Sequence, residues 1–389
     1  MRFFWKLCSV CLLLSVLWGQ GRGAFAAAGS LDGWVSVSAR AAVLMDQYGQ
    51  VLYAHNADER LPMASTTKIM TALVAIESGD VGRIVQIPAE AVGVEGSSVY
   101  LIAGEELSLL TLLYALMLES ANDAAVAIAV AIDGSVEKFA RRMNDKAAEL
   151  GLSDTHFENP HGLDAEAHYT TAKDLATLTV AALENEIFGK IVSTVRYSAS
   201  VDDGDSVRLF VNHNRLLREY EGCIGVKTGF TKRCGRCLVS AARRDGITLV
   251  AVTLNAPDDW RDHRAMLEYG FSRCAPVAIV PDGALCYTVP VVGGERTFVD
   301  CYAPDGVTLM LPEDTEALLR IELPRFLWGE IRAGDQVGQA VVVVNGKAAV
   351  TVPLCAASDV SPVIYEKSIW QRICDIFAAI GEWLAGWFD

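Results

Sequence analysis

The chain has little positive charge for its length. Its 389 residues carry 33 lysines and arginines against 48 aspartates and glutamates, a formal net charge of −15. No basic stripe is present, and an acidic chain of this kind is a poor binder of nucleic acid. Ten cysteines are too few, in a chain this long, for a small disulfide-stapled scaffold. A hydrophobic content of 52% argues against wholesale disorder, and the length of 389 residues favours two or three domains.

Several catalytic signatures are also missing. The sequence has no G-x-S-x-G elbow, which disfavours a generic α/β-hydrolase. It has no H-E-x-x-H pattern, although a metal-dependent peptidase stays as an alternative because four potential zinc ligands lie close together: His156, His161, Asp164 and His168. The pair Cys234 and Cys237 has the spacing of half a zinc or redox site, but no second matching pair exists. We therefore expect ordinary strand or turn cysteines there, whereas a Cys286–Cys301 disulfide is compatible with export.

The only strongly apolar N-terminal run is too short to cross a bilayer. Leu7–Trp18 follows Arg2 and Lys6 and precedes an A-x-A cleavage pattern, Ala24-Phe25-Ala26, with Ala26-Ala27-Ala28 as a close alternative. This order predicts a secretory signal peptide over residues 1–26, with a retained N-terminal anchor as the alternative. Removing the segment takes away three cations and no acids, which leaves 30 positive against 48 negative residues and a charge of −18.

Three short motifs follow one another along the chain: Ser65-Thr66-Thr67-Lys68, Ser120-Ala121-Asn122 and Lys227-Thr228-Gly229. Each is weak alone, because Ser and Lys are common residues. Ser135-Val136-Glu137-Lys138 also fits the first pattern, but it comes after the Ser120 motif and lies in a polar helical stretch. The ordered set is an established signature of penicillin-binding proteins and class A β-lactamases, and it is much more specific than any one motif.

The residue types in these motifs suit nucleophilic catalysis without a histidine. Ser65 and Lys68 are three residues apart, so on a helix they share a face and the amine can reach the hydroxyl. A neutral Lys68 can act as general base, and a second cation nearby, Lys227, helps to keep it neutral. Ser120 can relay a proton, and Asn122 can orient Lys68 or a substrate amide.

The third motif is typical of a strand that binds a substrate. Glycine at position 229 lets a substrate backbone pair with the edge that includes Lys227 and Thr228. The amide N–H groups of Ser65 and Phe230 would form an oxyanion hole. The competing interpretation, a helix N-cap serine and solvated lysines, explains each residue alone but not the ordered set.

Periodicity predicts an α+β domain followed by a β-rich one. Strands early and late in the first part enclose a helical block, so we expect one sheet that combines both ends of this domain. After about Cys274 short strands and turns dominate. The predicted strands are 41–46, 51–56, 225–229, 238–243, 248–254, 336–345 and 348–354, and the helices 63–78, 107–118, 122–132, 137–150, 171–184 and 262–272. The predicted division is 1–26, 27–274, 275–362 and 363–389.

From about Val37 onward the chain resembles the low-molecular-weight penicillin-binding proteins, specifically serine-type D-alanyl-D-alanine carboxypeptidases of peptidase family S11. Beyond the three motifs, the similar segments are 159–164 (NPHGLD), 169–175 (YTTAKDL), 212–217 (NHNRLL), 225–231 (GVKTGFT), 333–338 (AGDQVG) and 352–354 (VPL). One departure is Ala121, where glycine or aspartate is frequent in the family. A small residue should be tolerated there.

The resemblance implies removal of the terminal D-alanine from peptidoglycan stem pentapeptides through an acyl-enzyme on Ser65, and acylation by β-lactams. It implies helices packed on a largely antiparallel five-stranded sheet, no cofactor and no metal, and a place outside the bacterial cytoplasmic membrane on the cell-wall side. A serine β-lactamase is the main alternative, but the E-x-x-L-N segment of class A enzymes is missing. A non-catalytic peptidoglycan-binding module is disfavoured because Ser65 and Lys68 are both present.

Residues 369–388 have the pattern of an amphipathic helix. At 100° per residue one face collects nine apolar side chains: Trp370, Ile373, Ile376, Phe377, Ile380, Trp383, Leu384, Trp387 and Phe388. Arg372, Asp375 and Glu382 lie on the other face and disfavour a helix that spans the membrane. We expect this helix to lie on the membrane surface. Packing on the β-rich domain or dimerisation is the alternative.

Overall fold

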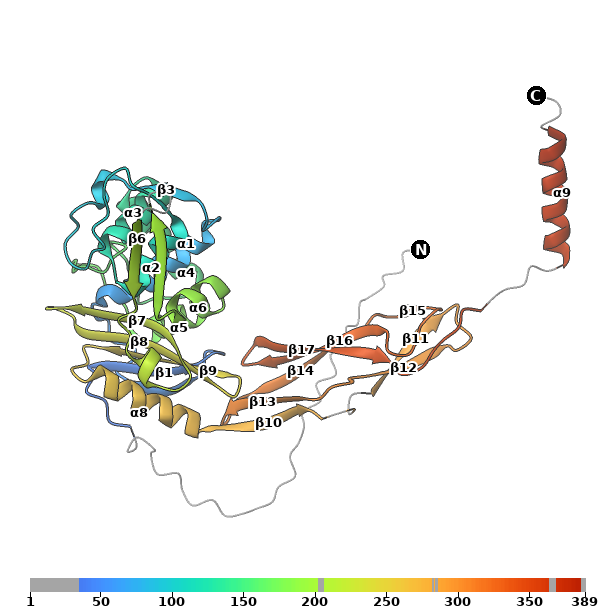
Figure 1. The fold of residues 1–389 in the computed structure, drawn as a ribbon. Helices are drawn as coiled ribbons and strands as arrows, with labels where there is room; N and C mark the ends of the chain where they lie inside the picture. Colours follow the sequence, from blue (N-terminus) through green and yellow to red (C-terminus); the bar gives the residue numbers. More distant parts are fainter. Residues whose placement is uncertain (1–34, 202–205, 282, 284–285, 364–368, 386–389) are drawn as a thin grey trace, which may run out of the picture. The chain divides into compact units, whose positions relative to one another are not determined.

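The computed structural model describes residues 35–201, 206–281, 283, 286–363 and 369–385. Its elements form an α+β part up to Ser272 and a β-rich part from Cys274 onward (Figure 1). Each part has its own cluster of buried apolar side chains. This arrangement confirms the predicted fold class. The predicted signal segment and the last four residues lie outside the described residues.

One antiparallel sheet lies at the centre of the α+β part. Its strands run in the order β2-β1-β9-β8-β7, so two strands from the start of the domain pair with three from its end. Every residue of β1 and β9 is buried, which explains their continuous apolar sequences. β7, which carries the third motif, is an edge strand. The bounds are β1 Ala41–Asp46, β2 Val51–His55, β7 Cys223–Thr231, β8 Gly235–Arg244 and β9 Ile247–Leu254.

Helices cover this sheet and form most of the core (Figure 1). The first helical segment divides into a 3-10 turn, η2 (Ala64–Thr67), and α1 (Lys68–Glu77), which is buried over most of its length. Side-chain caps begin several of the others, as Ser108 does for α2 and Thr171 for α5. The remaining helices are α2 Leu109–Leu118, α3 Asn122–Asp133, α4 Val136–Glu149, α5 Ala172–Leu183, α6 Glu186–Ser193, α7 Leu216–Glu219 and α8 Asp259–Ser272.

Two small two-stranded sheets were not predicted. β3 (Ile84–Gln86) pairs with β4 (Glu106–Ser108), so the predicted start of a helix at residue 107 was wrong by two residues. β5 (Arg196–Val201) pairs with β6 (Ser206–Val211). The short 3-10 turn η3 (Ala89–Ala91) follows β3. The loop between β3 and β4 and the strand β6 contact the second motif and the residues around it, as the site geometry shows.

The β-rich part contains a six-stranded sheet in the order β14-β16-β17-β12-β11-β15 and a separate pair, β10 with β13. The predicted hairpin forms around Asn345 and Gly346, which both adopt positive φ angles as a tight turn requires. The strands of the β-rich part are β10 Cys274–Val280, β11 Cys286–Val292, β12 Phe298–Tyr302, β13 Val307–Pro312, β14 Ala317–Glu322, β15 Leu327–Trp328, β16 Gln336–Val344 and β17 Lys347–Ala356.

The Cys286–Cys301 disulfide does not form. Both residues have free thiols, and β11 and β12 pair so that Cys286 lies opposite Tyr302 and Cys301 opposite Tyr287. Cys286 is exposed and Cys301 is fully buried, because residues offset by one along paired strands point to opposite faces. The two side chains therefore cannot meet across the hairpin.

The last described element is α9 (Ile369–Ala385). Its apolar residues with described side chains are mostly exposed, among them Trp370 and Phe377. Among the described residues, no helix is both long enough and apolar enough to span a membrane.

Candidate active site

Ser65 and Lys68 lie at the junction between η2 and α1. Ser65 is in the 3-10 turn, and Lys68 is the first residue of the α-helix. The Lys68 Nζ donates to Ser65 Oγ at 3.0 Å, to Asn122 Oδ1 at 2.6 Å and to the His161 carbonyl at 2.7 Å. The first and second motifs thus meet at one amine.

Burial changes the acid–base chemistry of that amine. Lys68 is fully buried, and this burial together with the nearby Lys227 holds the pKa of the Lys68 amine well below its usual value, against the opposing effect of Asp123. A lowered pKa makes the neutral form of lysine, which has a lone pair and can accept a proton, easier to reach. The surroundings of Lys68 therefore favour a base over a permanent cation.

The carbonyl of His161 comes from the loop 159–164. Gly162 makes the close packing of this loop possible, because a Cβ there would lie 2.0 Å from the Ala64 carbonyl oxygen, and its φ is +88°. Thr71 Oγ1 donates to the Pro160 carbonyl at 2.6 Å and fastens the loop to α1. Sequence reasoning named the segment as similar to the family but missed its carbonyl as a partner of Lys68.

Asn122 has its amide orientation fixed from two sides. Its Nδ2 donates to the Glu95 carbonyl at 2.6 Å, which leaves Oδ1 to accept from Lys68. Its backbone N–H donates to the Ser97 carbonyl at 2.7 Å. Ser120, two residues earlier, is buried and has a φ of +59°, a left-handed conformation uncommon for serine. The turn between α2 and α3 thus presents both polar side chains of the second motif.

The edge strand β7 brings the third motif against Ser65. A Cβ on Gly229 would lie 3.1 Å from the Ser65 nitrogen and 3.2 Å from the Thr66 nitrogen, so only glycine lets the strand approach this closely without displacement. Lys227 is 2% exposed, and its Nζ donates to the Thr228 carbonyl at 2.9 Å. Burial lowers the pKa of the Lys227 amine to about 7. Phe230 follows with an exposed side chain.

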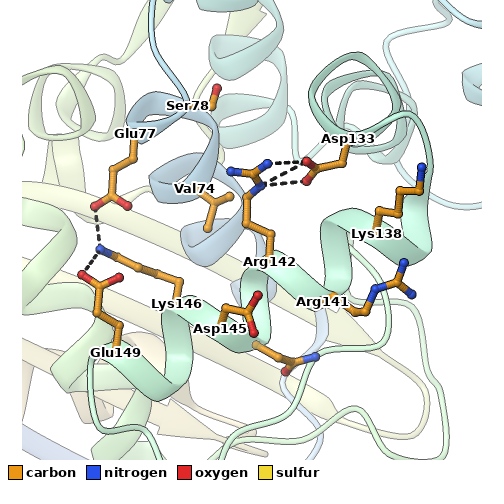
Figure 2. A pocket seen from close by; sticks show the side chains of 11 residues that line it. Val74, Glu77, Ser78, Asp133, Lys138, Arg141, Arg142, Asp145, Lys146 and Glu149 are labelled. Atoms are coloured by element: carbon orange, nitrogen blue, oxygen red, sulfur yellow. Dashed lines mark hydrogen bonds and ion pairs between the residues drawn. The ribbon is translucent and has the colours of Figure 1, made fainter.

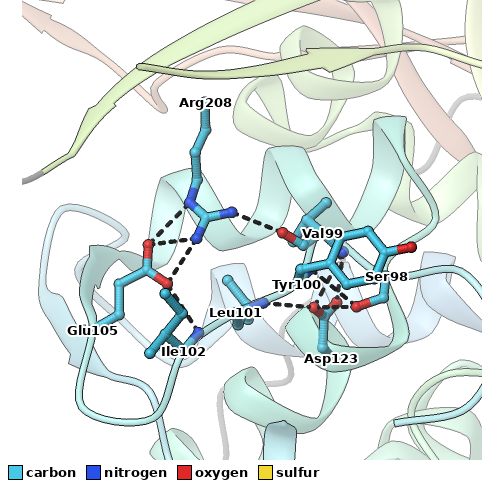
Figure 3. A network of polar contacts seen from close by, with 8 residues as sticks. All are labelled: Ser98, Val99, Tyr100, Leu101, Ile102, Glu105, Asp123 and Arg208. Atoms are coloured by element: carbon cyan, nitrogen blue, oxygen red, sulfur yellow. Dashed lines mark hydrogen bonds and ion pairs between the residues drawn. The ribbon is translucent and has the colours of Figure 1, made fainter. Parts of the chain in front are cut away.

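A buried carboxylate, Asp123, organises the loop beside Asn122 (Figure 3). It accepts hydrogen bonds from the Ser98 hydroxyl at 2.6 Å and from the backbone N–H groups of Val99 and Leu101, both at 3.1 Å. Since Glu95 and Ser97 in the same loop hold Asn122, the position of Asn122 depends on this fixed loop. Sequence reasoning did not single out Asp123, although it directly follows the second motif.

Arg208 on β6 ties the unpredicted hairpin to the same loop. Its guanidinium forms a bidentate ion pair with Glu105, with two hydrogen bonds of 2.9 Å, and donates to the Val99 carbonyl at 2.7 Å (Figure 3). Both side chains of the pair are mostly buried. Glu119, which precedes Ser120, accepts from the Val211 N–H at 2.5 Å. The hairpin therefore contacts both the start of the Ser120 turn and the loop that holds Asn122.

The proposed zinc ligands serve other contacts. His168 Nε2 hydrogen-bonds with Thr67 Oγ1 at 2.7 Å, and His156 Nδ1 bonds the Ala167 carbonyl at 2.7 Å. His161 Nδ1 accepts from the Leu163 N–H at 3.2 Å. Burial lowers the pKa of His161 to about 3 and that of His168 to about 4, so both rings are neutral. In the described ranges, no three His, Cys, Asp or Glu side chains converge as a metal ion requires.

The second Ser-x-x-Lys segment is a helix start. The Ser135 hydroxyl accepts from the Lys138 N–H at 3.3 Å and caps α4. Lys138 borders a groove of about 760 Å³ between the C-terminal end of α1 and α4 (Figure 2). The charges in this groove largely pair with one another, as Arg142 does with Asp133 and Lys146 does with Glu77 and Glu149. The groove lies at the opposite end of α1 from Ser65.

Comparison with known proteins gives two family matches. Residues 27–258 match the family described as D-alanyl-D-alanine carboxypeptidase, and residues 276–362 match the penicillin-binding protein 5, C-terminal domain. D-alanyl-D-alanine carboxypeptidase DacF of Bacillus subtilis is 33% identical over 334 residues, which cover 82% of this chain and 85% of the relative. DacC of Escherichia coli, of the same activity, is 30% identical over 374 residues and 91% of each chain.

Solved structures agree. Penicillin-binding protein 5 of Haemophilus influenzae is 28% identical with a TM-score of 0.59, over 84% of this chain and 98% of that one. The Streptomyces K15 DD-transpeptidase is 34% identical with a TM-score of 0.57, over 61% of this chain and 98% of that one. The first match covers too large a share of this chain to be confined to the α+β part.

Proposed function

The chain belongs to the D-alanyl-D-alanine carboxypeptidase family, and from this premise we propose that it removes the terminal D-alanine of peptidoglycan stem pentapeptides through an acyl-enzyme on Ser65. One observation carries the assignment of roles: the hydrogen-bond set of the buried Lys68 amine. A neutral amine has two N–H groups and one lone pair. The carbonyl oxygens of Asn122 and His161 can only accept, so they take the two N–H groups. In the charged amine a third N–H donates to Ser65 Oγ at 3.0 Å; once the amine is neutral, the lone pair takes that direction and can accept the Ser65 hydroxyl proton.

In the acylation step the Ser65 Oγ attacks the carbonyl carbon of the penultimate D-alanine, and the hydroxyl proton passes to Lys68 Nζ. The backbone N–H groups of Ser65 and Phe230 stabilise the negative oxygen of the tetrahedral intermediate. The C–N bond to the terminal D-alanine then breaks, and Ser120 relays the proton from Lys68 to the leaving amine. Water later attacks the ester carbonyl carbon and gives a proton to Lys68. The bond to Ser65 Oγ then breaks, and Lys68 returns that proton to Ser65 Oγ.

Lys227 and Thr228 bind the carboxylate at the end of the substrate. In its protonated form the buried Lys227 ammonium attracts an anion strongly, because few waters compete for it. Gly229 keeps the strand edge open beside Ser65, so the substrate backbone can lie along β7. A β-lactam that presents its carboxylate to Lys227 would place its strained amide at Ser65 and acylate the enzyme.

We propose the following division of the chain: residues 27–274 catalyse, residues 275–362 form the β-rich domain, and residues 363–389 attach the exported protein to the outer face of the cytoplasmic membrane. The support for attachment is the apolar exposure of α9, where Ile369, Trp370, Ile376, Phe377 and Ile380 are all exposed. A surface with so many apolar side chains on one helix suits a lipid interface.

Intact-mass measurement after incubation with benzylpenicillin tests the nucleophile. We expect wild-type protein and Ser135→Ala to gain the mass of one penicilloyl group, and Ser65→Ala to gain none. Peptide mapping should place the group on the peptide that contains Ser65. A penicilloyl adduct on Ser65→Ala would refute the assignment, and rapid turnover of penicillin by wild-type protein would favour a β-lactamase.

A further inference from the structure

We propose that an exposed apolar patch on the β-rich domain enters the lipid interface beside α9, as a second membrane contact. The patch, here called the aromatic patch, consists of Pro290, Val292, Phe298, Phe326 and Trp328. This inference rests on the proposed attachment through α9 and deepens it. It assigns a role to the edge of the six-stranded sheet that β12, β11 and β15 form.

The strand register places these side chains on one face. Phe298 on β12 lies opposite Pro290 on β11, and Trp328 on β15 lies opposite Val292. Pro290 and Val292 are two residues apart, so both point to the same side of β11. The intervening Val291 points to the buried side, as does Val299 next to Phe298. The three strands lie side by side at one edge of the sheet (Figure 1).

The patch is strongly exposed for apolar side chains. Trp328 is 71% exposed, Phe298 54%, Phe326 45% and Val292 43%. Phe326 packs edge-on against the Trp328 ring, with centroids 5.4 Å apart, so the two aromatic rings form one raised surface. Contiguous exposed apolar surface of this kind marks an interaction site, and Trp and Phe are favoured at the boundary between water and lipid.

The course of the chain indicates that the partner is a membrane. Val363 donates its N–H to the Gly293 carbonyl at 2.8 Å, one residue after Val292, so the chain leaves the β-rich domain at the border of the aromatic patch. Only five residues separate Val363 from Ile369 at the start of α9. At up to about 3.6 Å per residue over six steps, the two Cα atoms are at most about 22 Å apart. A helix lying on the membrane therefore keeps the patch close to the same surface.

Charge does not oppose this contact. The exposed residues that border the patch include Arg296 and Arg325 as well as Glu295 and Glu330, whereas the whole chain carries −15. The arginines can reach lipid phosphates while the rings enter the interface. Because the local charges balance, the contact should depend mainly on apolar burial and respond weakly to salt.

Vesicle partitioning of the full mature chain tests the proposal. Phosphatidylcholine vesicles serve as the probe, and binding is measured by co-sedimentation over a range of lipid concentrations. The patch variant is Phe298→Ser/Trp328→Ser. Leu318→Ser is the matched control, because Leu318 is 48% exposed on β14, the opposite edge strand of the same sheet. Trp370→Ser/Phe377→Ser/Ile380→Ser is the helix variant.

We expect the patch variant to lower the partition constant about tenfold, because transfer of each exposed ring from water to lipid is favourable. Leu318→Ser should change the partition constant less than twofold. Release of D-alanine from a soluble peptide should be equal in all these proteins. If the patch variant binds vesicles as wild type does, the patch inference is wrong while α9 attachment stands. If the helix variant binds undiminished, attachment through α9 is wrong. If wild-type protein does not bind vesicles, both fail.

A second measurement needs no variant. Hydrogen–deuterium exchange of wild-type protein with and without vesicles should show slower exchange in residues 290–298 and 326–329 and no change in β14. Unchanged exchange at the patch, in protein bound to vesicles, would overturn the inference. So would a vesicle-free dimer that Phe298→Ser/Trp328→Ser converts to monomer without altering partitioning, because the patch would then join two copies.

Discussion

Two regions of the molecule carry the same pattern, Ser-x-x-Lys, and the structure gives them opposite surroundings. Around Ser65 the lysine is fully buried and bonded to a hydroxyl and two carbonyl oxygens. Around Ser135 the hydroxyl caps α4, and Lys138 lies at the edge of an open groove. The comparison shows that the same spacing can place a lysine in very different surroundings, and the proposed base role of Lys68 depends on those surroundings. Burial, a neighbouring cation and fixed acceptors change the chemistry of one amine and leave the other a surface charge.

Replacing each lysine by arginine should give the largest contrast. Lys68→Arg keeps the charge, but arginine cannot lose a proton at working pH. Acylation by benzylpenicillin should therefore slow by about 10²–10⁴-fold, the usual rate contribution of general acid–base catalysis. Lys138→Arg should acylate at the wild-type rate. Stopped-flow measurement of acylation provides both rates. A Lys68→Arg enzyme within about tenfold of wild type would show that Lys68 is not the base.

The pH dependence of kcat/KM should distinguish the role of Lys68 from that of Lys227. Lys68 must be neutral, so kcat/KM rises as Lys68 loses its proton, at a pH well below the usual lysine pKa. Lys227 must be charged to hold the substrate carboxylate, so kcat/KM falls as pH rises through about 7, the pKa of Lys227. A bound carboxylate stabilises the ammonium, and the fall in kcat should therefore come at higher pH than the fall in kcat/KM.

Lys227→Ala tests the same assignment. It should remove the alkaline fall and raise KM, and it should move the acid limb to higher pH, because loss of the neighbouring cation raises the pKa of Lys68. Steady-state assays of D-alanine release across pH measure all three effects. An alkaline limb that persists unchanged in Lys227→Ala would assign that limb to another group.

Arg208 provides a smaller effect through the loop that holds Asn122. Arg208→Ala removes the contacts with Glu105 and the Val99 carbonyl and should slow acylation by roughly tenfold, because misplacement of catalytic groups is costly. Arg142→Ala is the control, since it breaks a comparable two-pronged pair with Asp133 in the distant groove. Equal acylation rates in the two variants, together with the same pH profile, would show that the Arg208 contact does not position the site.

Ser135→Ala should have the smallest effect and only on stability. Loss of the N-cap of α4 should lower the free energy of unfolding by about 1 kcal/mol, a typical value for capping serines. Acylation by benzylpenicillin should not change. Urea unfolding monitored by circular dichroism measures the difference. A variant that loses acylation while remaining folded would mean that the second Ser-x-x-Lys segment takes part in catalysis after all.

Much of the fold could be predicted because its strongest patterns are local. The alternation and apolar runs of β1, β8 and β9 and the long helices α2 to α5 follow from periodicity, and Asn345-Gly346 marks its hairpin. The two-stranded sheets β3–β4 and β5–β6 were not predicted, because their strands are short or half exposed. Such strands gain stability from tertiary contacts, such as the ion pair of Arg208 with Glu105. Whether Cys286 and Cys301 pair could not be decided in advance, because cross-strand register is not visible in the sequence.

Only those site residues whose side chains belong to the three motifs could be predicted from the sequence. Ser65, Lys68, Asn122 and Lys227 come from the ordered patterns, and the structure brings them together. The carbonyl of His161 could not be predicted, because any residue carries a carbonyl and its position depends on the packing of Gly162 against Ala64. Asp123 acts through backbone N–H groups more than 20 residues away in sequence, a contact that only the folded chain creates.

The central claim, that burial makes Lys68 a neutral base, can be tested directly by NMR. Protein labelled with [ε-¹³C]lysine is titrated with pH, and the Lys68 resonance is identified by its absence from Lys68→Arg. We predict a titration midpoint well below 10.5, the ordinary lysine value, and a higher midpoint in Lys227→Ala, where the neighbouring cation is gone. A Lys68 midpoint at or above 10.5 in the wild-type protein would contradict the account.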